Sequence, residues 1–562
     1  MKKFNCLPFY MFIFGFLGLT GCSYSPHTNT YEKDIQEHVL RVNRHGYLIQ
    51  NDIALASSHK KTTAKPLLND NATNMIDTMF IEALVLSCSK QNNKNIEEDS
   101  CRKAIKQHYK KETHNLSSLP SNYLSLDTPI KLLIYFHGGL NTMDATDKRM
   151  EDTLDKIEKE KADWHYPIYV SWPSNAPGTY SEHLFNIREG RNTNFAVGLF
   201  STPFILFEDL VTSVGKLPST MYYQATNEKD RVASGIASSL LSSIWVDAFE
   251  QYKTHTGVET LQPSEEHISF TANSNNILVN RSQYSRGNWD QWSTGIGHTV
   301  VLPIRYVIGS VWNGVIASQS WDVMKRRARN MFYPSGLYDR RFQSVEPNTK
   351  QLDNKIGDSG QHAGLFFEKL FIFASKNPGL NIELTLVGHS MGTIAINNLL
   401  NKYQEDWISS NILSTIVYMA AAANIEETLS ALKPVLKNKK SNIPFYNLTL
   451  NRVAEIAESY AYGLAPSGSL LVSIDKYHDM PEHHLKRTFG SENNIQSSLS
   501  TILDEFREID SCITFKSFNS VKPDQDKILM TEPEKHGDFG SLPFWRKEIW
   551  SMKGFNGCTS IR

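Results

Sequence analysis

The pentapeptide Gly388-His389-Ser390-Met391-Gly392 is the part of the sequence best suited to chemistry. Its form, Gly-x-Ser-x-Gly, is a weak signal by itself in a chain with 31 glycines. The signal is stronger here because an apolar run of strand length comes directly before it and helix-forming residues follow. A sharp strand-turn-helix bend would expose the hydroxyl of Ser390 at the carboxyl end of a strand. We therefore predict that Ser390 is a nucleophile, with Gly388 and Gly392 leaving room for the bend.

The sequence resembles the α/β-hydrolases of the serine esterase and lipase kind. The resemblance covers about residues 131–173 and 360–540, and the bend around Ser390 is its most specific part. It implies an α/β fold with a mostly parallel sheet flanked by helices, and a catalytic triad whose chain order is Ser, acid, His. No metal or organic cofactor is needed for such chemistry.

A second turn completes the resemblance. Phe136-His137-Gly138-Gly139 is similar to the His-Gly turn that follows the third sheet strand in that family. The resemblance implies an oxyanion hole, in which backbone N–H groups hold the negative charge that develops on the reacting oxygen. Its donors would be the N–H of Met391 and one N–H from the segment Gly138, Gly139 and Leu140. A simple turn at a sheet edge is the other interpretation of this segment.

The chain order implied by the resemblance also selects the base. A serine hydroxyl needs a base to accept its proton, and the chain has 18 histidines. His536 follows the last strand-like runs near the C-terminus, where the family places its base, so we predict that it accepts the proton of Ser390. His478, His483 and His484 are the alternatives.

The acid of the triad stays open between two carboxylates. The family's acid follows a strand that corresponds here to 445–450, but Asn451 comes directly after that run. Glu455 is nearest in position, and Asp475 follows an apolar run, 470–474. We predict that Glu455 or Asp475 holds the His536 ring, with Glu458 as a third possibility.

Alternating apolar runs and helical patterns supply the elements that must position these residues. Runs of strand length without polar interruption are typical of strands buried on both faces of a parallel sheet. Strands are expected at 132–136, 167–172, 382–387, 414–419 and 445–450, and helices at 144–161, 363–374 and 391–400. A helix is also expected around 75–86, in an N-terminal region to which the sequence assigns no role.

Residues 175–351 are far longer than a crossover between parallel strands needs. We expect a mainly helical insertion that acts as a lid or cap on the hydrolase domain. Its apolar stretches, at 195–214, 236–249 and 299–317, fit either buried helices or a surface that touches lipid. Charged residues in the first and third stretches argue against membrane spans.

The N-terminus has the pattern of an export signal. Lys2 and Lys3 precede an apolar stretch, 7–19, which is short for a membrane span. The following Leu19-Thr20-Gly21-Cys22 resembles a bacterial lipobox, which implies that residues 1–21 are removed and that Cys22 carries fatty acyl chains such as palmitate. By the same analogy, Ser23 indicates the outer membrane. A plain secretory signal or an uncleaved anchor would be the alternatives.

The cysteines agree with export to an oxidising compartment. After Cys6 and Cys22 are set aside, Cys88, Cys101, Cys512 and Cys558 form an even set. Pairing between neighbours in sequence is the preferred arrangement, and four free buried thiols are the alternative. No Cys-x-x-Cys pair is present, and no familiar ligand spacing indicates a metal site.

Composition and motifs together define the predicted protein. Lys and Arg total 58 against 59 Asp and Glu, without a long run of one sign, which disfavours a nucleic-acid partner. We expect a signal peptide (1–21), a tether and N-terminal region (22–125) and a hydrolase domain (126–562). The expected activity is cleavage of carboxylic esters, including lipid or acyl esters, at a membrane of the bacterial cell envelope. A non-catalytic envelope lipoprotein that uses the fold as a binding scaffold is the alternative, and the oligomeric state stays open.

Overall fold

The structure of the chain is a computed structural model. It describes residues 37–49, 69–91, 97–111, 129–141, 143–160, 165–188, 191–192, 195–236, 267–272, 275–280, 312–333, 362–438, 442–458, 468–518 and 533–551. The expected signal peptide, Cys22, Cys558 and parts of the expected insertion lie outside these residues.

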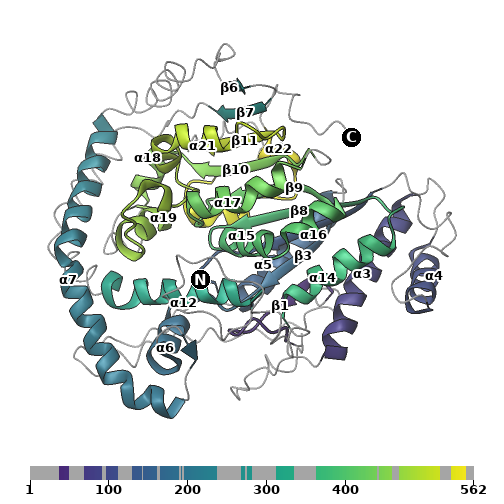
Figure 1. The fold of residues 1–562 in the computed structure, drawn as a ribbon, viewed down its shortest axis with the longest axis horizontal. Coiled ribbons are helices and arrows are strands. Elements are labelled where there is room, and N and C mark those ends of the chain that lie inside the picture. The colour runs from purple at the N-terminus through teal and green to yellow at the C-terminus, as the bar shows by residue number, and fades with distance from the viewer. Residues whose placement is uncertain are drawn as a thin grey trace, which may run out of the picture.

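A nine-stranded sheet forms the centre of the molecule (Figure 1). All neighbouring strands are parallel except the pair β6–β7 at one edge. The predicted α/β class with a mostly parallel sheet is therefore confirmed. From edge to edge, the order is β1 (Val39–Arg41), β3 (Tyr166–Ser171), β2 (Ile130–Phe136), β8 (Ile382–His389), β9 (Leu413–Met419), β10 (Phe445–Leu450), β11 (Ile513–Phe518), β7 (Asn275–Asn280) and β6 (His267–Ala272).

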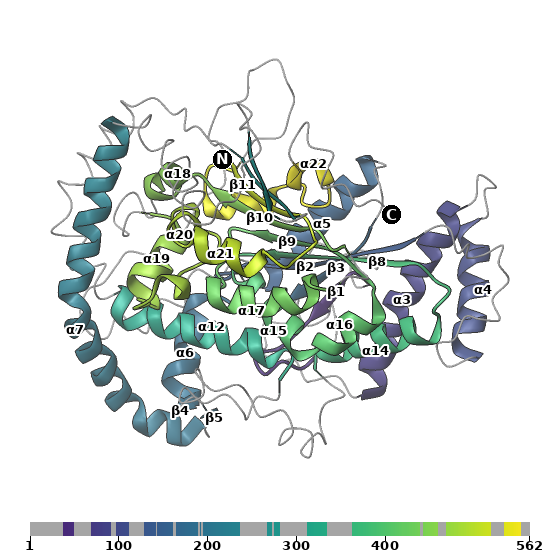
Figure 2. The same cartoon turned by 45° about the horizontal axis from the view of Figure 1, so that its top comes forward.

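Helices cover both faces of this sheet (Figure 2). One face carries α15 (Gly392–Lys402), α16 (Gln404–Ser410) and α17 (Ile425–Leu436), and the other carries α5 (Met143–Glu160) and the short α22 (Lys547–Trp550). Parallel strands need such crossover helices to return the chain to the same sheet edge. The carboxyl ends of all strands except β6 therefore meet at one edge, where β8 continues into α15.

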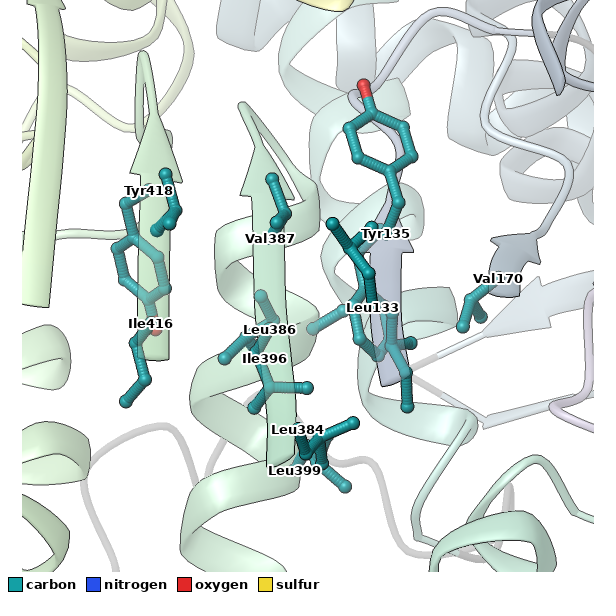
Figure 3. Close-up of a cluster of buried hydrophobic side chains, with 14 of the residues drawn as sticks. Leu133, Tyr135, Val170, Leu384, Leu386, Val387, Ile396, Leu399, Ile416 and Tyr418 are labelled. Atoms are coloured by element: carbon teal, nitrogen blue, oxygen red, sulfur yellow. The ribbon is translucent and has the colours of Figure 1, made fainter. Parts of the chain in front are cut away.

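The core lies between the sheet and α15 (Figure 3). Branched and aromatic side chains of neighbouring strands, such as Leu386 and Tyr418, are fully buried there together with Ile396 and Leu399 of α15. Burying a side chain of this size is worth about 1.5 to 3 kcal/mol. This packing fixes the position of α15 relative to β8, and with it the bend that joins them.

The N-terminal region belongs to the same core. Strand β1 pairs with β3 at the sheet edge, and a helical hairpin, α3 (Asn69–Gln91) and α4 (Glu98–Lys111), packs on α14 (Gly364–Lys376). The ring centroids of Phe80 and Phe366 are 5.0 Å apart at that contact.

A disulfide closes the α3–α4 hairpin. It joins Cys88 to Cys101, as predicted, with an S–S distance of 2.03 Å. Cys512 is also disulfide-bonded, and its partner lies outside the described residues. The predicted pairing of Cys512 with Cys558 stays a prediction.

The inserted segment is not only helical. It supplies α6 (Ala176–Asn186), a short β4–β5 pair (Ile187–Arg188 and Arg191–Asn192), the 42-residue α7 (Phe195–Ile236), the π-helix η2 (Trp312–Ala317) and α12 (Ser318–Asn330). It also supplies β6 and β7, and β7 pairs in parallel with β11. The insertion therefore extends the central sheet, which the sequence pattern did not predict.

Helix α12 is fixed to the rest of the insertion by a buried ion pair. Arg327 donates from Nη2 to Glu182 Oε2 of α6 at 2.5 Å, and both side chains are almost fully buried. Helix α12 also packs on α15, beside the bend that follows β8 (Figure 2).

Short helices fill the segment between β10 and β11. They are α18 (Arg452–Ala457), α19 (Leu470–Ser473), η7 (Ile474–His478), η8 (His484–Lys486), α20 (Glu492–Ser497) and α21 (Leu499–Phe506). The apolar run 470–474, which resembled a strand, forms the helix α19 and the start of η7. A short apolar run fits a buried helix as well as a strand.

Candidate active site

Ser390 occupies the tight bend between β8 and α15. Its φ of 51° lies in the left-handed region, which residues other than glycine rarely adopt. The strain is held by hydrogen bonds on both sides: Ser390 N–H donates to the carbonyl of Met419 at 2.9 Å, and the carbonyl of Ser390 accepts from Thr393 Oγ1 at 2.7 Å. Residues whose strained backbone is held in place by the surrounding structure are found mainly at functional sites.

Close contacts surround the glycines beside Ser390, and the contact of Gly392 with backbone leaves no room for a side chain. A β-carbon on Gly392 would lie 2.2 Å from the carbonyl oxygen of Phe136 in β2, and one on Gly388 would lie 2.8 Å from the Cδ1 of Ile396. One on Gly138 would lie 3.1 Å from the β-carbon of Ser390. The bend and the turn after β2 are therefore in close contact, as the resemblance implied.

His536 meets Ser390 from the other end of the chain. Its Nε2 lies 2.8 Å from Ser390 Oγ across 146 residues of sequence. His536 begins the 3-10 helix η9 (His536–Ser541). Burial lowers its pKa to about 4, so the imidazole is neutral at pH 7 and able to accept a proton. The structure brings together the two residues that the sequence analysis selected as nucleophile and base.

A second histidine holds the His536 segment. Nε2 of His389 donates to the carbonyl of His536 at 3.1 Å, and the two ring centroids are 5.3 Å apart. Burial is the main cause that lowers the pKa of His389, and the nearby His536 lowers it further. His389 is therefore a neutral donor that connects the bend to the segment carrying the base, a contact that the sequence analysis missed.

Both predicted acids have partners other than the His536 ring. Glu455 Oε2 accepts from Ser491 Oγ at 2.8 Å. Asp475 accepts from Asn494 Nδ2 at 2.6 Å and from Thr488 N at 2.9 Å. Burial raises the pKa of Glu455 well above its usual range and that of Asp475 to about 6. Within the described residues, the structure joins neither carboxylate to His536.

Glu458 is the carboxylate bonded to His536. Its Oε2 accepts the backbone N–H of His536 at 3.0 Å, and the side chain is buried. Nδ1 of the His536 ring is buried too, without a hydrogen-bond partner in the described part of the chain. The sequence analysis placed Glu458 third among the candidate acids. The contact joins positions 78 residues apart, so it depends on the fold and not on local sequence.

One of the expected oxyanion donors is engaged elsewhere. Leu140, with a φ of 64°, donates its N–H to the carbonyl of Ser174 at 2.9 Å. This leaves Met391, Gly138 and Gly139 as candidates. A β-carbon on Gly139 would lie 3.5 Å from that of Met391, so the backbones of these two residues approach each other.

His137 anchors the turn that carries these donors. Its ring stacks on Trp172 with centroids 3.9 Å apart, and its Nδ1 lies 2.6 Å from the carbonyl of Gly138. Burial lowers its pKa to about 4. A neutral, buried imidazole with both nitrogens near backbone groups fits a structural part in holding the turn.

The alternative bases lie elsewhere. His478 is half-buried in η7, where its carbonyl accepts from Ser318 Oγ at 3.3 Å. His483 and His484 lie beside each other in an exposed segment, with tilted rings whose centroids are 4.3 Å apart. In the described residues none of the three is bonded to Ser390, and no group of His, Cys, Asp and Glu there could hold a metal ion.

The site is closed to solvent in this conformation. Ser390 is 1% exposed and His536 is 4% exposed. Met324 of α12 packs on the turn after β2, with its sulfur 3.6 Å from the place where a β-carbon on Gly139 would lie. We therefore expect the elements around Ser390 to move when a substrate enters.

Comparisons with known proteins found no relative of this chain. No protein-family model, no curated protein and no solved structure matches this chain. The functional argument therefore depends on the geometry of the site.

Proposed function

We propose that this protein is a serine hydrolase of the α/β-hydrolase kind that cleaves carboxylic esters through an acyl-enzyme intermediate. The observation that carries the proposal is the 2.8 Å contact between Ser390 Oγ and His536 Nε2 at a strained bend between a strand and a helix. A nucleophile within hydrogen-bond distance of a neutral base is the arrangement that activates a serine.

The proposed reaction has two halves. His536 Nε2 takes the hydroxyl proton while Ser390 Oγ bonds to the carbonyl carbon of the ester. The tetrahedral intermediate then expels the alcohol, which receives the proton from His536, and Ser390 is left acylated. Water repeats the sequence: it gives a proton to His536, attacks the acyl carbon and releases the carboxylic acid and free Ser390.

Two turns would stabilise the negative oxygen. The N–H groups of Met391 and of Gly138 or Gly139 belong to backbones that approach each other beside Ser390. Preorganised donors of this kind are worth about 3 to 4 kcal/mol each in a site that excludes water. The engaged N–H of Leu140 has no part in this proposal.

We assign the third position of the triad to Glu458 in place of Glu455 and Asp475. Its carboxylate already accepts the backbone N–H of His536, and the Nδ1 of the same residue is buried without a hydrogen-bond partner in the described residues. A carboxylate that accepts Nδ1–H holds the tautomer in which Nε2 can receive the serine proton. The proposal requires the ring or the carboxylate to move as substrate enters, so that Nδ1–H and the Glu458 carboxylate come within hydrogen-bond distance.

The substrate class follows from the expected location. A lipoprotein acylated at Cys22 and exported to the outer membrane would meet acyl esters at a membrane surface. Helix α12 would act as the lid, because it packs beside the closed nucleophile. Thioesters and peptides are cleaved by the same chemistry on this fold. A panel of p-nitrophenyl esters of increasing chain length, with and without detergent, would show which acyl chain length the enzyme prefers.

An active-site probe tests the proposal. A fluorophosphonate should label the wild-type chain, and Ser390→Ala should abolish labelling. The matched control is Ser409→Ala, which removes an exposed hydroxyl on α16 and should leave labelling unchanged. Labelling that persists in a folded Ser390→Ala variant would rule out Ser390 as the nucleophile.

A non-catalytic envelope scaffold is the second candidate. The observation in its favour is the buried Nδ1 of His536, which lacks a partner in the described residues. In that case the folded wild-type chain would resist the probe even in the presence of detergent micelles.

A further inference from the structure

We propose that the outer face of helix α7 lies in the plane of a lipid membrane, with its apolar side chains inserted among the acyl chains of one leaflet. Helix α7 forms the curved outer edge of the molecule, away from the sheet (Figures 1 and 2). Ala196–Asn227 is the one helical segment in the described residues that is long and apolar enough to cross a membrane, and only 22% of its most apolar stretch is buried. A core helix would be mostly buried.

The face of α7 that packs against the protein is polar. Thr202 Oγ1 donates to the carbonyl of Leu184 at 2.8 Å, and Asp209 Oδ2 accepts from Tyr180 at 3.2 Å and contacts His183 at 3.2 Å. Further along the helix, Asn227 is bonded to Tyr477 and Lys476. From 196 to 222, the buried residues of α7 are all polar or glycine: Gly198, Thr202, Asp209, Ser213 and Thr220.

The face that points outward is apolar. Phe200, Phe204 and Phe207 are 82%, 77% and 68% exposed. Between 196 and 222, Glu208 is the only exposed residue with a charge. The same face includes Val197, Leu199, Leu206, Leu210, Val211, Val214, Leu217, Met221 and Tyr222, all at least 37% exposed.

This distribution is the reverse of that of a helix on the surface of a water-soluble domain. There, the apolar stripe faces the core and the polar side faces water. In contact with lipid the preference inverts, because hydrocarbon offers no partner to polar groups and these pair within the protein. The hydrogen bonds of Thr202, Asp209 and Asn227 follow the second pattern. The occupant of the outer face is therefore hydrocarbon.

The helix lies along the membrane surface and does not cross it. Its polar face is packed along its length against α6, η2 and the short helices η7 and α18, so a spanning orientation would drag these elements into the bilayer. Pro203 and Pro218 each remove a backbone hydrogen bond and bend the helix around the body of the protein. Helices with one apolar face lie in the interface in this way.

The site of attachment agrees with the expected lipid anchor. Cys22 would hold the mature N-terminus at the same membrane, and only 14 residues separate it from the first described residue, Glu37. An extended segment of this length reaches about 50 Å, so the body of the protein stays near the bilayer. The inference does not depend on the proposed hydrolase activity.

Site-specific fluorescence tests the depth of α7. The full chain carrying Ser390→Ala is reconstituted into phosphatidylethanolamine–phosphatidylglycerol vesicles with an environment-sensitive dye on Phe204→Cys. The matched control places the dye on Ile372→Cys of α14, which is 47% exposed on another helix. Both chains share the N-terminal anchor, so anchoring alone cannot separate them. The parent chain without an added cysteine gives the labelling background.

We expect a blue-shifted emission at position 204 that nitroxide lipids quench, and a water-like, unquenched emission at position 372. A water-like emission at 204 would overturn the proposal. A blue shift that persists without lipid and resists nitroxide lipids would also overturn it: sedimentation as a dimer would identify a second copy as the occupant, and sedimentation as a monomer would identify another segment of the chain. Since Ser390→Ala cannot acylate, none of these outcomes depends on catalysis.

Discussion

Helices α15 and α7 bury opposite kinds of side chain. Helix α15 turns Ile396 and Leu399 into the core against the sheet, whereas α7 turns Thr202 and Asp209 inward and leaves Phe200 exposed. The first arrangement is that of a helix whose outer side is in water, and the second is that of a helix whose outer side meets hydrocarbon. The difference separates a region held by core packing, to which we assign catalysis, from a region that we assign to the membrane.

The largest expected effect is the loss of activity when Ser390, at the bend before α15, is replaced. Ser390→Ala should lower kcat/KM for a soluble ester by about 10⁴- to 10⁶-fold, because it removes the bond-forming oxygen. Vesicle flotation of the same variant should be unchanged, since α7 is intact. If Ser390→Ala kept most of its activity, the reaction could not take place at Ser390 in the bend after β8.

Replacement of the proposed acid should give the next largest effect. Glu458→Gln should lower kcat by about 10²- to 10⁴-fold with a smaller change in KM, because the His536 tautomer is no longer fixed. Glu455→Gln is the matched control, since Glu455 is buried nearby but bonded to Ser491. The opposite ranking of the two variants would return the third position to Glu455.

The free energy of unfolding should distinguish the core between β8 and α15 from the outer face of α7. Leu386→Ala, in β8 against α15, should lower the free energy of unfolding by about 2 to 5 kcal/mol, because it leaves a cavity at a fully buried position. Phe204→Ser on α7 should change it by less than about 1 kcal/mol, because that side chain is 77% exposed. Urea unfolding of the two variants in detergent measures both values, and a large loss in Phe204→Ser would show that this face packs against protein.

Activity at a membrane should be affected more modestly. The triple variant Phe200→Ser, Phe204→Ser, Phe207→Ser should hydrolyse a vesicle-embedded ester about tenfold more slowly than wild type, because fewer apolar groups hold the site at the interface. Its rate on a water-soluble ester should stay within about twofold of wild type. Ile372→Ser on α14 is the control and should match wild type on both substrates; an equal loss on both substrates in the triple variant would indicate damage to the active site instead.

The pH profile should show the smallest effect. Burial lowers the pKa of His536 to about 4, so its neutral form persists at pH values where an ordinary histidine, near 6.5, is already protonated. We expect kcat/KM for a soluble ester to stay near its plateau at pH 6 and to fall only as the pH decreases toward 4. A midpoint at or above 6.5 would mean that the base is more exposed in the reactive state or is another group.

Local pattern was sufficient to predict the central part of the fold. Strands β10 and β8 begin where the apolar runs 445–450 and 382–387 begin, because a strand buried on both faces has few polar residues. The bend at Ser390 was predictable for the same reason, since strand, glycines and helix are adjacent in sequence. The addition of β6 and β7 to the sheet was not, because β7 pairs with β11 across more than 200 residues and no local feature encodes that partner.

The partners of the base also depend on distant contacts. Chain order selected His536, but the carboxylate beside it is decided by how α18 and η9 meet in space, and Glu455 and Glu458 differ by less than one helical turn. The run 470–474 misled in another way: Ser469 caps a helix there, accepting from Val472 N–H, so Asp475 does not follow a strand. Periodicity over five residues is too short to separate the two conformations.

The buried pair of Glu182 and Arg327 limits how the active site can open. Separation of the two would leave an unpaired charge in a low-dielectric interior, at a cost of about 3 to 5 kcal/mol. Helices α6 and α12 are therefore expected to travel as a rigid unit, and α6 is bonded to α7 through Tyr180 and His183. A displacement of α7 on binding to the bilayer would thus move α6 and α12 as well. Because α12 packs beside Ser390, membrane binding and substrate access would then be coupled.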